Sequence, residues 1–157
     1  MTRAMLVTVL YKLAGAPELE GENLFTDVSP ADYYYKPVVW ASHHGVVSGT
    51  STTSFSPKRA ITREQVAVML LHYYLGCDPE AESRVKGDLS AFLDEAQISA
   101  YARVAMAWAV ENEIISGSDT EEGRVLKPGG SATRAEVAMM IMRFAELLEA
   151  HGYWMPG

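Results

Sequence analysis

The sequence predicts an all-α protein built from helix-loop-helix repeats. Three observations support this prediction: a short motif occurs three times before apolar residues at helical spacing, a longer motif precedes its two later copies, and polar connectors separate the resulting units. The composition, with 48% hydrophobic and 21% charged residues, is that of an ordinary globular chain. Because a lone helical hairpin cannot bury its apolar faces, the units are expected to pack on one another.

The short motif reads "MTRAM" at the start of the chain, then "ITREQ" and later "ATRAE". Taking Thr2, Thr62 and Thr133 as N-caps, we expect a helix to start after each threonine. The two later copies carry Gln or Glu three residues after the threonine, as in a capping box. The apolar residues at helical spacing are Leu6, Val9, Leu10 and Leu13, then Val66, Met69, Leu70 and Tyr73, then Val137, Met140, Ile141 and Phe144.

The longer motif is "FTDVSPADYYYKPVVWASHHGVVSG" in its first copy and "FLDEAQISAYARVAMAWAVENEIISG" in its second. Both copies predict a helix that carries a core tryptophan, Trp40 or Trp108. Pro37 lacks a backbone N–H and is tolerated only in the first turn of a helix. The helix with Trp40 should therefore begin near Tyr34.

Glu113 occupies the position that Gly45 has in the first copy of the longer motif. A helix commonly ends there in a left-handed residue, which is usually glycine. We therefore expect Glu113 either to have a positive φ angle, at a cost of about 1 kcal/mol, or to follow a helix that ends differently.

The repeats divide the chain into modules and connectors. Residues 1–15 are the trailing half of a first repeat, 24–76 and 91–148 are two complete repeats, 16–23 and 77–90 are linkers, and 149–157 are a tail. The first repeat lacks its leading half. Some apolar residues of its helix, such as Leu6, Val9 and Leu13, are therefore expected to be exposed, unless self-association or an upstream segment covers them.

Charge and composition exclude several classes of function. The net charge of −7 disfavours nucleic acid as a partner, because such binding needs a basic surface. The single cysteine, Cys77, excludes an internal disulfide framework and a cysteine-rich zinc site. No stretch approaches a membrane span, which needs about 18 apolar residues. The start of the chain has the outline of a signal peptide, but Lys12 interrupts it and the segment aligns with two internal helices, so we interpret it as a helix.

The sequence does not indicate an enzyme or a cofactor site. No nucleophile, base and orienting group can be argued together for catalysis. His43 and His44 are adjacent and are predicted to point in different directions on a helix, which makes a poor metal pair. We therefore expect a non-catalytic protein without a metal or another cofactor.

The two longer motifs, the loops after them and the "TR" motifs together resemble the S-layer homology domain, in the order F-x-D, Y, WA, S-G, F-x-P and T-R. The resemblance covers nearly the whole chain apart from linkers and tail. It implies a pseudo-threefold helical bundle of three repeats, here with the first repeat truncated. It also implies grooves between repeats that bind secondary cell-wall polysaccharide, often through a pyruvylated sugar, and an extracellular location at a bacterial cell wall or S-layer. The chain departs from the family pattern at Met5, at Glu113, and at Tyr33 and Tyr101, where Trp is usual.

Three arginines occupy an unfavourable position and are the main candidates for ligand binding. Arg3, Arg63 and Arg134 lie in the first turn of their predicted helices, where the helix dipole disfavours a cation by about 0.3–1 kcal/mol. A guanidinium beside free backbone N–H groups suits a carboxylate or phosphate, so we favour anion recognition. The alternative is an ion pair with an acid of a neighbouring repeat, such as Asp27 or Asp94.

The other candidate ligand-binding residues come from the longer motif: Tyr33, Tyr101, Asp27, Asp94, Gly49 and Gly117. The tyrosines keep a ring that can stack on a sugar. The aspartates also have a structural interpretation, as residues that cap or brace a turn. The predicted function is a non-catalytic anchor for acidic wall polysaccharide, and the alternative is a protein-protein interaction scaffold with the same helical architecture.

Overall fold

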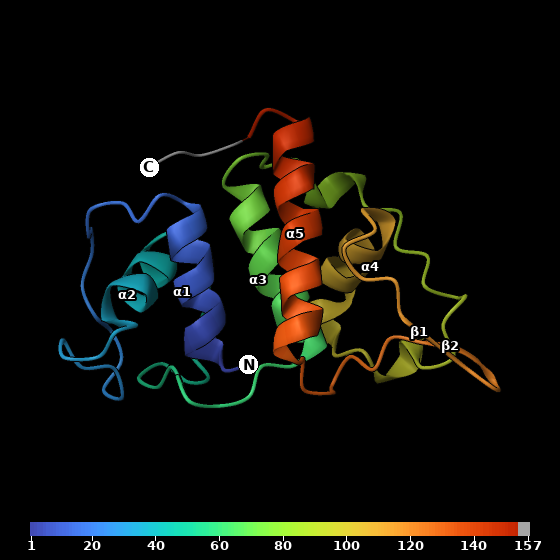
Figure 1. Ribbon diagram of the computed structural model, residues 1–157, viewed down its shortest axis with the longest axis horizontal. Helices are drawn as coiled ribbons and strands as arrows, with labels where there is room; N and C mark the ends of the chain where they lie inside the picture. Colours follow the sequence, from blue (N-terminus) through green and yellow to red (C-terminus); the bar gives the residue numbers. More distant parts are fainter. Residues whose placement is uncertain (154–157) are drawn as a thin grey trace. The chain divides into compact units, whose positions relative to one another are not determined.

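The computed structural model describes residues 1–153, and its contacts divide the chain into two compact units, Met1–Ile61 and Thr62–Tyr153. The described elements are helices joined by long loops, with one short sheet (Figure 1). In chain order they are α1 (Arg3–Leu13), α2 (Tyr35–His43), α3 (Arg63–Leu75), η1 (Glu82–Arg84), η2 (Glu95–Gln97), η3 (Ala100–Ala102), α4 (Arg103–Glu111), β1 (Ser118–Thr120), β2 (Gly123–Val125) and α5 (Arg134–Ala150). Within this part of the chain, no helix has the length and apolar character needed to cross a membrane.

In the first unit, α1 packs against α2, the leading helix of the following repeat (Figure 1). The rings of Tyr11 and Trp40 meet edge to face with centroids 5.6 Å apart, and Trp40 is buried, as predicted. Leu6 is also buried, while Val9 and Leu13 are half-buried. The expectation of exposed apolar residues on α1 is therefore wrong, and the packing of α2 against α1 contributes to their burial.

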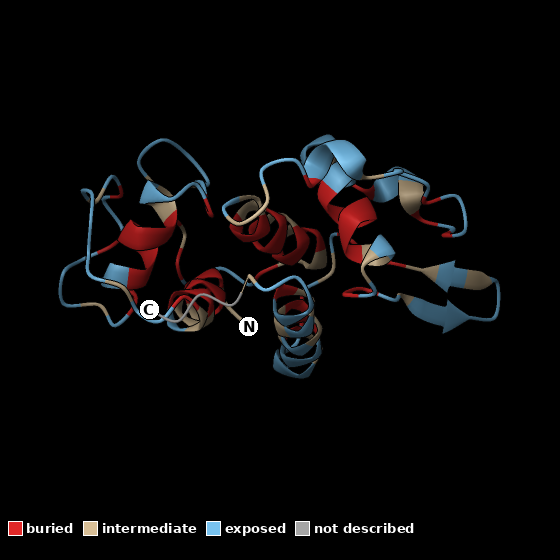
Figure 2. Cartoon of the chain, turned by 90° about the horizontal axis from the view of Figure 1, so that it is seen from above, coloured by how far each residue is buried: buried red, intermediate tan, exposed pale blue. Residues whose placement is uncertain are grey.

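In the second unit, α3 contacts both α4 and α5 (Figure 1). Phe144 of α5 joins the three helices, because its ring centroid lies 5.5 Å from that of Tyr73 on α3 and 6.2 Å from that of Trp108 on α4. Figure 2 shows that α3 is buried along most of its length, whereas α5 is buried along one stripe. The buried residues of α5 are Val137, Met140, Phe144 and Leu148.

Both units use the same pairing of helices. A helix that begins with a "TR" motif, α1 or α3, packs against the leading helix of the next repeat, α2 or α4. The interhelical core of each unit is therefore built across a linker. The boundaries of the sequence repeats and the pseudo-threefold arrangement of α1, α3 and α5 stay predictions.

The predicted helix starts are confirmed. Thr2, Thr62 and Thr133 are the N-caps of α1, α3 and α5, and the last two form complete capping boxes. The helix α2 begins at Tyr35, so Pro37 falls in its first turn, where its missing N–H costs nothing.

Of the two alternatives expected at Glu113, the positive φ angle is the one that the structure confirms. Glu113 has a φ angle of 59°, close to the 70° of Gly45 after α2. Both chain segments therefore leave their helix in the same way, although only glycine is free of the steric cost of this conformation.

A small sheet in the loop after α4 departs from the all-α prediction. The strands β1 and β2 pair antiparallel, with Asp119 opposite Arg124. The Asp119 carboxylate lies 3.0 Å from Nε of Arg124, which forms a cross-strand ion pair. Strands of three residues are too short to produce a readable alternation of apolar and polar residues, so the sequence pattern does not reveal them.

Candidate functional site

In each unit a loop folds back onto the start of an arginine-bearing helix. The first two backbone N–H groups of α1 and of α3 donate to carbonyl oxygens of these loops. The four hydrogen bonds, each 3.0 Å long, are Arg3 to Arg59, Ala4 to Pro57, Arg63 to Gly130 and Glu64 to Pro128. The N–H groups expected to help bind an anion are therefore already occupied in α1 and α3, because the chain returns to satisfy them.

Asp27 and Asp94 brace these loops. The carboxylate of Asp27 accepts the N–H groups of Phe55 and Ser56 at 2.9 and 2.8 Å. The carboxylate of Asp94 accepts those of Leu126 and Lys127 at 2.8 and 2.7 Å. Backbone groups thus stand in place of the arginine partners that the sequence suggested for these acids.

In both braced loops, the residue before the proline has the same strained, left-handed backbone conformation. Ser56 has a φ angle of 57° and Lys127 one of 51°, although both carry a side chain. Each donates its N–H to the bracing aspartate, and charge-assisted bonds of this kind offset the cost of the left-handed conformation. The hydrogen bond to Asp94 therefore fixes the backbone position of Lys127, from which its side chain extends.

Arg3 is enclosed by the first loop. It is 5% exposed, and its guanidinium donates from Nε to the carbonyl of Phe55 and from Nη2 to that of Ser48, both at 3.0 Å. Its Cζ atom also lies 4.8 Å from the centroid of the Phe55 ring, in cation–π contact. Arg3 therefore joins the start of α1 to the loop after α2.

Arg63 instead forms an ion pair with the start of α5. Its Nε and Nη2 atoms donate to the two carboxylate oxygens of Glu136 at 2.7 and 2.8 Å. The hydrogen bonds from Arg63 hold the pKa of Glu136 below its usual value. Glu136 also closes the capping box of α5 with Thr133, so one carboxylate serves both the cap and the arginine. Arg134 is exposed at the start of the same helix.

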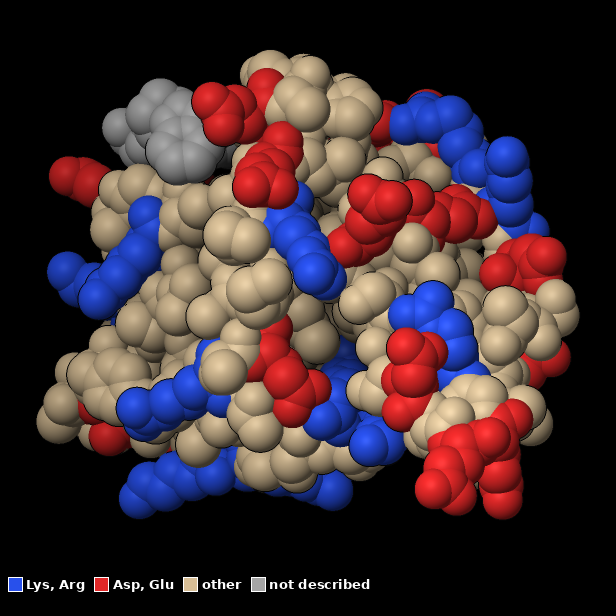
Figure 3. All heavy atoms as spheres, turned by 45° about the vertical axis from the view of Figure 1, so that its right-hand side comes forward, with Lys and Arg blue, Asp and Glu red and all other residues tan. Residues whose placement is uncertain are grey.

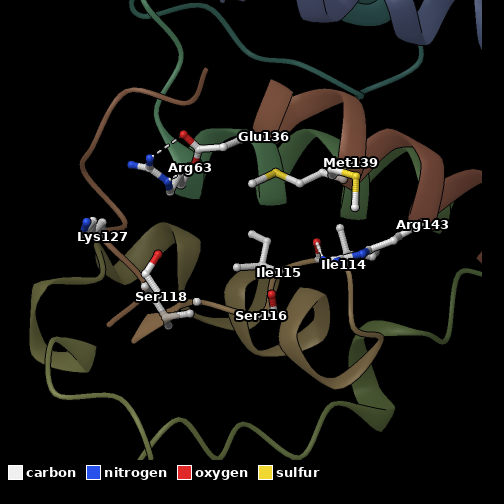
Figure 4. A pocket seen from close by; sticks show the side chains of 12 residues that line it. Arg63, Ile114, Ile115, Ser116, Ser118, Lys127, Glu136, Met139 and Arg143 are labelled. Carbon is white, nitrogen blue, oxygen red and sulfur yellow. Dashed lines mark hydrogen bonds and ion pairs between the residues drawn. The ribbon is translucent and has the colours of Figure 1, made fainter. Parts of the chain in front are cut away.

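Arg63 and Glu136 lie at one side of a groove of about 420 Å³ (Figure 4). The groove has three basic side chains: Arg63 from α3, Lys127 from the braced loop and Arg143 from α5. Its lining also includes the apolar side chains of Ile114 and Ile115 (Figure 4). The complete lining is Arg63, Ile114, Ile115, Ser116, Gly117, Ser118, Leu126, Lys127, Glu136, Met139, Met140 and Arg143.

Gly117 lies at this groove and Gly49 at the equivalent point of the first unit. Gly117 has a φ angle of 77°, and a Cβ atom there would come within 2.8 Å of the Val125 carbonyl oxygen. A Cβ atom at Gly49 would collide with the carbonyl of Ser51. Both glycines are thus required for close packing of their loops.

The tyrosines that replace the usual tryptophans are exposed. Tyr33 is 64% exposed and Tyr101 is 63% exposed. The hydroxyl of Tyr101 lies 3.4 Å from the buried carboxylate of Glu64, which also accepts the N–H and hydroxyl of Ser99. Tyr33 borders a separate hollow of about 360 Å³, together with Lys36.

Sequence reasoning missed most of the groove. Of the lining residues, the sequence identified Arg63 and Gly117 as candidates. It did not identify the charged residues Lys127, Glu136 and Arg143. A usable signal was present in α5, where the groove residues follow helical spacing: Glu136, Met139, Met140 and Arg143. This helix face has an acid, Glu136, at one end and a base, Arg143, at the other, which is unusual for a face buried in a core.

The two adjacent histidines do not diverge as predicted. Their ring centroids lie 5.1 Å apart, and His44 is the C-cap residue that follows α2. Both side chains are exposed. Because His44 lies beyond the last helical residue, helical geometry does not force the two imidazole rings apart.

Comparison with known proteins places these features in a family. The family model of the S-layer homology domain matches residues 24–67 and 91–138, which together make up more than half of the chain. The "Surface-layer 125 kDa protein" of Lysinibacillus sphaericus is 30% identical over 133 residues, which cover 85% of this chain and 11% of that protein.

Two similar proteins are named as enzymes. The amylopullulanase of Thermoanaerobacterium thermosulfurigenes is 28% identical over 93% of this chain and 8% of its own length. Exoglucanase XynX of Acetivibrio thermocellus is 30% identical over 93% of this chain and 13% of its own length. The chain therefore spans only about a tenth of the relatives that it matches. The matched segments contain both braced-loop aspartates and both exposed tyrosines, and on this evidence the chain belongs to the S-layer homology domain family.

Proposed function

We propose that this chain is a non-catalytic module that anchors a longer protein at the bacterial cell surface by binding an acidic cell-wall polysaccharide. Membership of the S-layer homology family supports cell-surface anchoring. The share of each relative that the chain covers supports a role as one module of a larger protein. The relatives named as enzymes would then owe their catalysis to other parts of their chains.

The observation that carries this proposal is a basic groove on an acidic protein. The chain has a net charge of −7, and Figure 3 shows acidic and basic side chains interspersed over the face that it draws. Around the groove of the second unit, by contrast, three basic side chains meet one acid, Glu136. A local excess of positive charge in a concave site favours an anionic ligand even when the whole protein repels anions.

The geometry around Arg63 suggests different roles for the three basic side chains of the groove. Glu136 engages Nε and Nη2 of Arg63, so this guanidinium is held in place by the protein itself. Lys127 and Arg143 then meet the carboxylate of the ligand, for which a pyruvylated sugar is the favoured source. Charge-assisted hydrogen bonds of this kind are about twice as strong as neutral ones.

Sugar rings are proposed to stack on the exposed tyrosines. An aromatic face that is open to solvent suits the apolar face of a pyranose. Glu64 and Ser99 hold the segment that carries Tyr101. The hollow beside Tyr33, with Lys36 at its edge, is the corresponding candidate in the first unit.

The remaining candidates are assigned supporting parts in the same proposal. Arg134 keeps its proposed role in anion binding, because it is exposed at the start of α5. Arg3, Asp27, Asp94, Gly49 and Gly117 are proposed to act through the loops that they hold. We also infer that α1, α3 and α5 form the pseudo-threefold bundle.

The experiment that tests this function uses purified wall polysaccharide in two forms. The native polymer is compared with polymer from which the acidic substituents have been removed chemically. Each form is used as an insoluble preparation, and binding is measured as the amount of this chain that sediments with it. We expect binding to the native form only. Equal binding to both forms would contradict the role of the basic groove.

A second candidate function is a protein-protein interaction scaffold. It is favoured by large apolar side chains that are exposed in the second unit: Leu93, Val104, Met139 and Met142. Such side chains suit a protein interface when they gather on one surface. The same sedimentation experiment separates the two candidates, because a scaffold would bind neither form of the polymer.

A further inference from the structure

Three potential metal ligands converge in the first unit, outside the grooves described above. They are Glu20 from the segment between α1 and α2, His43 at the end of α2, and His44 just after it. One ligand atom from each residue lies within 4.8 Å of the other two. Nε2 of His43 and a carboxylate oxygen of Glu20 are 3.9 Å apart.

The backbone around Gly21 brings Glu20 to the histidines. Gly21 has a φ angle of 90°, and a Cβ atom at this position would lie 2.7 Å from Nδ1 of His43. The loop can therefore lie against the imidazole only because this residue is glycine. On the other side, the ring of His44 contacts the buried Trp40, with centroids 5.8 Å apart. Contacts from both sides thus orient the pair.

The chemistry of these ligands matches a first-row transition metal. Two imidazole nitrogens and one carboxylate oxygen form a set that zinc uses in sites that keep a fourth position open to water. Metal–ligand distances of about 2.0–2.2 Å require the ligand atoms to approach one another to about 3.5 Å. The side chains of His43 and Glu20 are 45% and 73% exposed, so small rotations can achieve this without disturbing the core.

The local electrostatics also favour a cation. The site lies at the C-terminal end of α2, where the helix dipole favours positive charge. Glu18 and Glu22 flank Glu20 in the same segment and add negative charge to it. We propose that Glu20, His43 and His44 bind one divalent transition-metal ion, with zinc as the fitting class, and that the ion fastens the first linker to the end of α2.

This proposal is independent of the polysaccharide proposal and is tested by titration of the chain with ZnCl₂. The 157-residue chain, without an added histidine tag, is titrated in a calorimeter. We expect one zinc ion per chain and a higher melting temperature in its presence. His43→Ala and His44→Ala should each weaken binding by about tenfold or more, and Glu20→Gln should weaken it as well, because each removes one ligand.

His72→Ala is the matched control, because His72 is a histidine of α3 outside the cluster, and it should leave zinc affinity unchanged. Calcium is the control ion, since it takes oxygen ligands and should not compete with zinc here. Equal zinc affinity in the wild-type chain and in both cluster histidine variants would overturn the proposal. Displacement of zinc by calcium, or full affinity in Glu20→Gln, would overturn the three-ligand site.

Discussion

Arg3 and Arg63 occupy the same position of the same motif but have different surroundings. Arg3 is enclosed by its loop and donates to two backbone carbonyls. Arg63 donates to the carboxylate of Glu136 and borders an open groove. Both helices start at a threonine N-cap and donate two backbone hydrogen bonds to the returning loop, so the different surroundings of the arginines arise beyond the helix start.

Two substitutions in the loops accompany this difference. Phe55, whose ring covers Arg3, is replaced by Leu126, which has no aromatic face for a guanidinium. Ser56, the strained residue of the first loop, is replaced by Lys127, which adds a positive charge to the groove. The same motif can therefore be enclosed by its loop in one unit and border an open groove in the other, depending on a few residues in the loop that meets it.

The largest expected effect is on stability when Arg3 is removed. Arg3→Ala leaves the carbonyls of Ser48 and Phe55 without their donor, so the free energy of unfolding should fall by about 3 kcal/mol. Arg63→Ala should cost clearly less, because its ion pair is partly exposed. Urea unfolding of both variants checks this order. A larger loss in Arg63→Ala would break the distinction between the two arginines.

The two bracing aspartates should also contribute unequally to stability. Among the arginines the more buried residue belongs to the first unit, but among the aspartates it belongs to the second. Asp94 is 7% exposed whereas Asp27 is exposed, although both accept two backbone N–H groups. Asp94→Ala should therefore lower the free energy of unfolding by about 2 kcal/mol, and Asp27→Ala by about half as much. Thermal melting of the two variants measures the difference. Equal losses would mean that burial does not decide the strength of the brace.

The Arg63–Glu136 pair should make stability depend on pH. Because the pKa of Glu136 is lowered in the folded state, its contribution is present above the usual pKa of a glutamate and is lost as pH falls through the lowered value. Glu136→Gln should cost about 1 kcal/mol near neutral pH and less in acid. Unfolding is measured at several pH values, with Glu146→Gln as the control because Glu146 is exposed on the same helix. A pH-independent loss would argue against the ion pair.

The smallest expected effect concerns the left-handed residues that follow α2 and α4. Glu113→Gly should raise the free energy of unfolding by roughly 0.5–1 kcal/mol, because glycine adopts a positive φ angle without steric cost. Gly45→Ala should lower it by a similar amount, since the space for a Cβ atom is open but the conformation is strained. Paired melting curves test both substitutions. Destabilisation by Glu113→Gly would indicate a specific contact of the glutamate.

Features governed by nearby residues could be predicted from the sequence. The three threonine caps, the start of α2 before Pro37 and the positive φ angle of Glu113 each follow from residues within a few positions. The core role of Trp40 likewise followed from its apolar neighbours.

Features that join distant residues could not be predicted. Glu136 lies 73 residues after Arg63, and many other acids were equally available in the sequence. The returning loops that occupy the N–H groups of α1 and α3 have no local signature, and the short hairpin is below the length at which a pattern appears. The groove combines Arg63 with residues of the hairpin, of the second returning loop and of α5, so its other lining residues could not be predicted from the motif that carries the arginine.

The role of the groove is tested most directly by the affinity of the chain for native wall polysaccharide after Lys127 and Arg143 are replaced. We predict that the double variant Lys127→Ala/Arg143→Ala binds at least about tenfold more weakly than the wild-type chain, because charged hydrogen bonds contribute about 1.5–3 kcal/mol each. Its melting temperature should remain close to that of the wild type. Lys86→Ala, which removes an exposed lysine outside the groove, should bind normally. Wild-type affinity in the double variant would contradict polysaccharide binding in this groove.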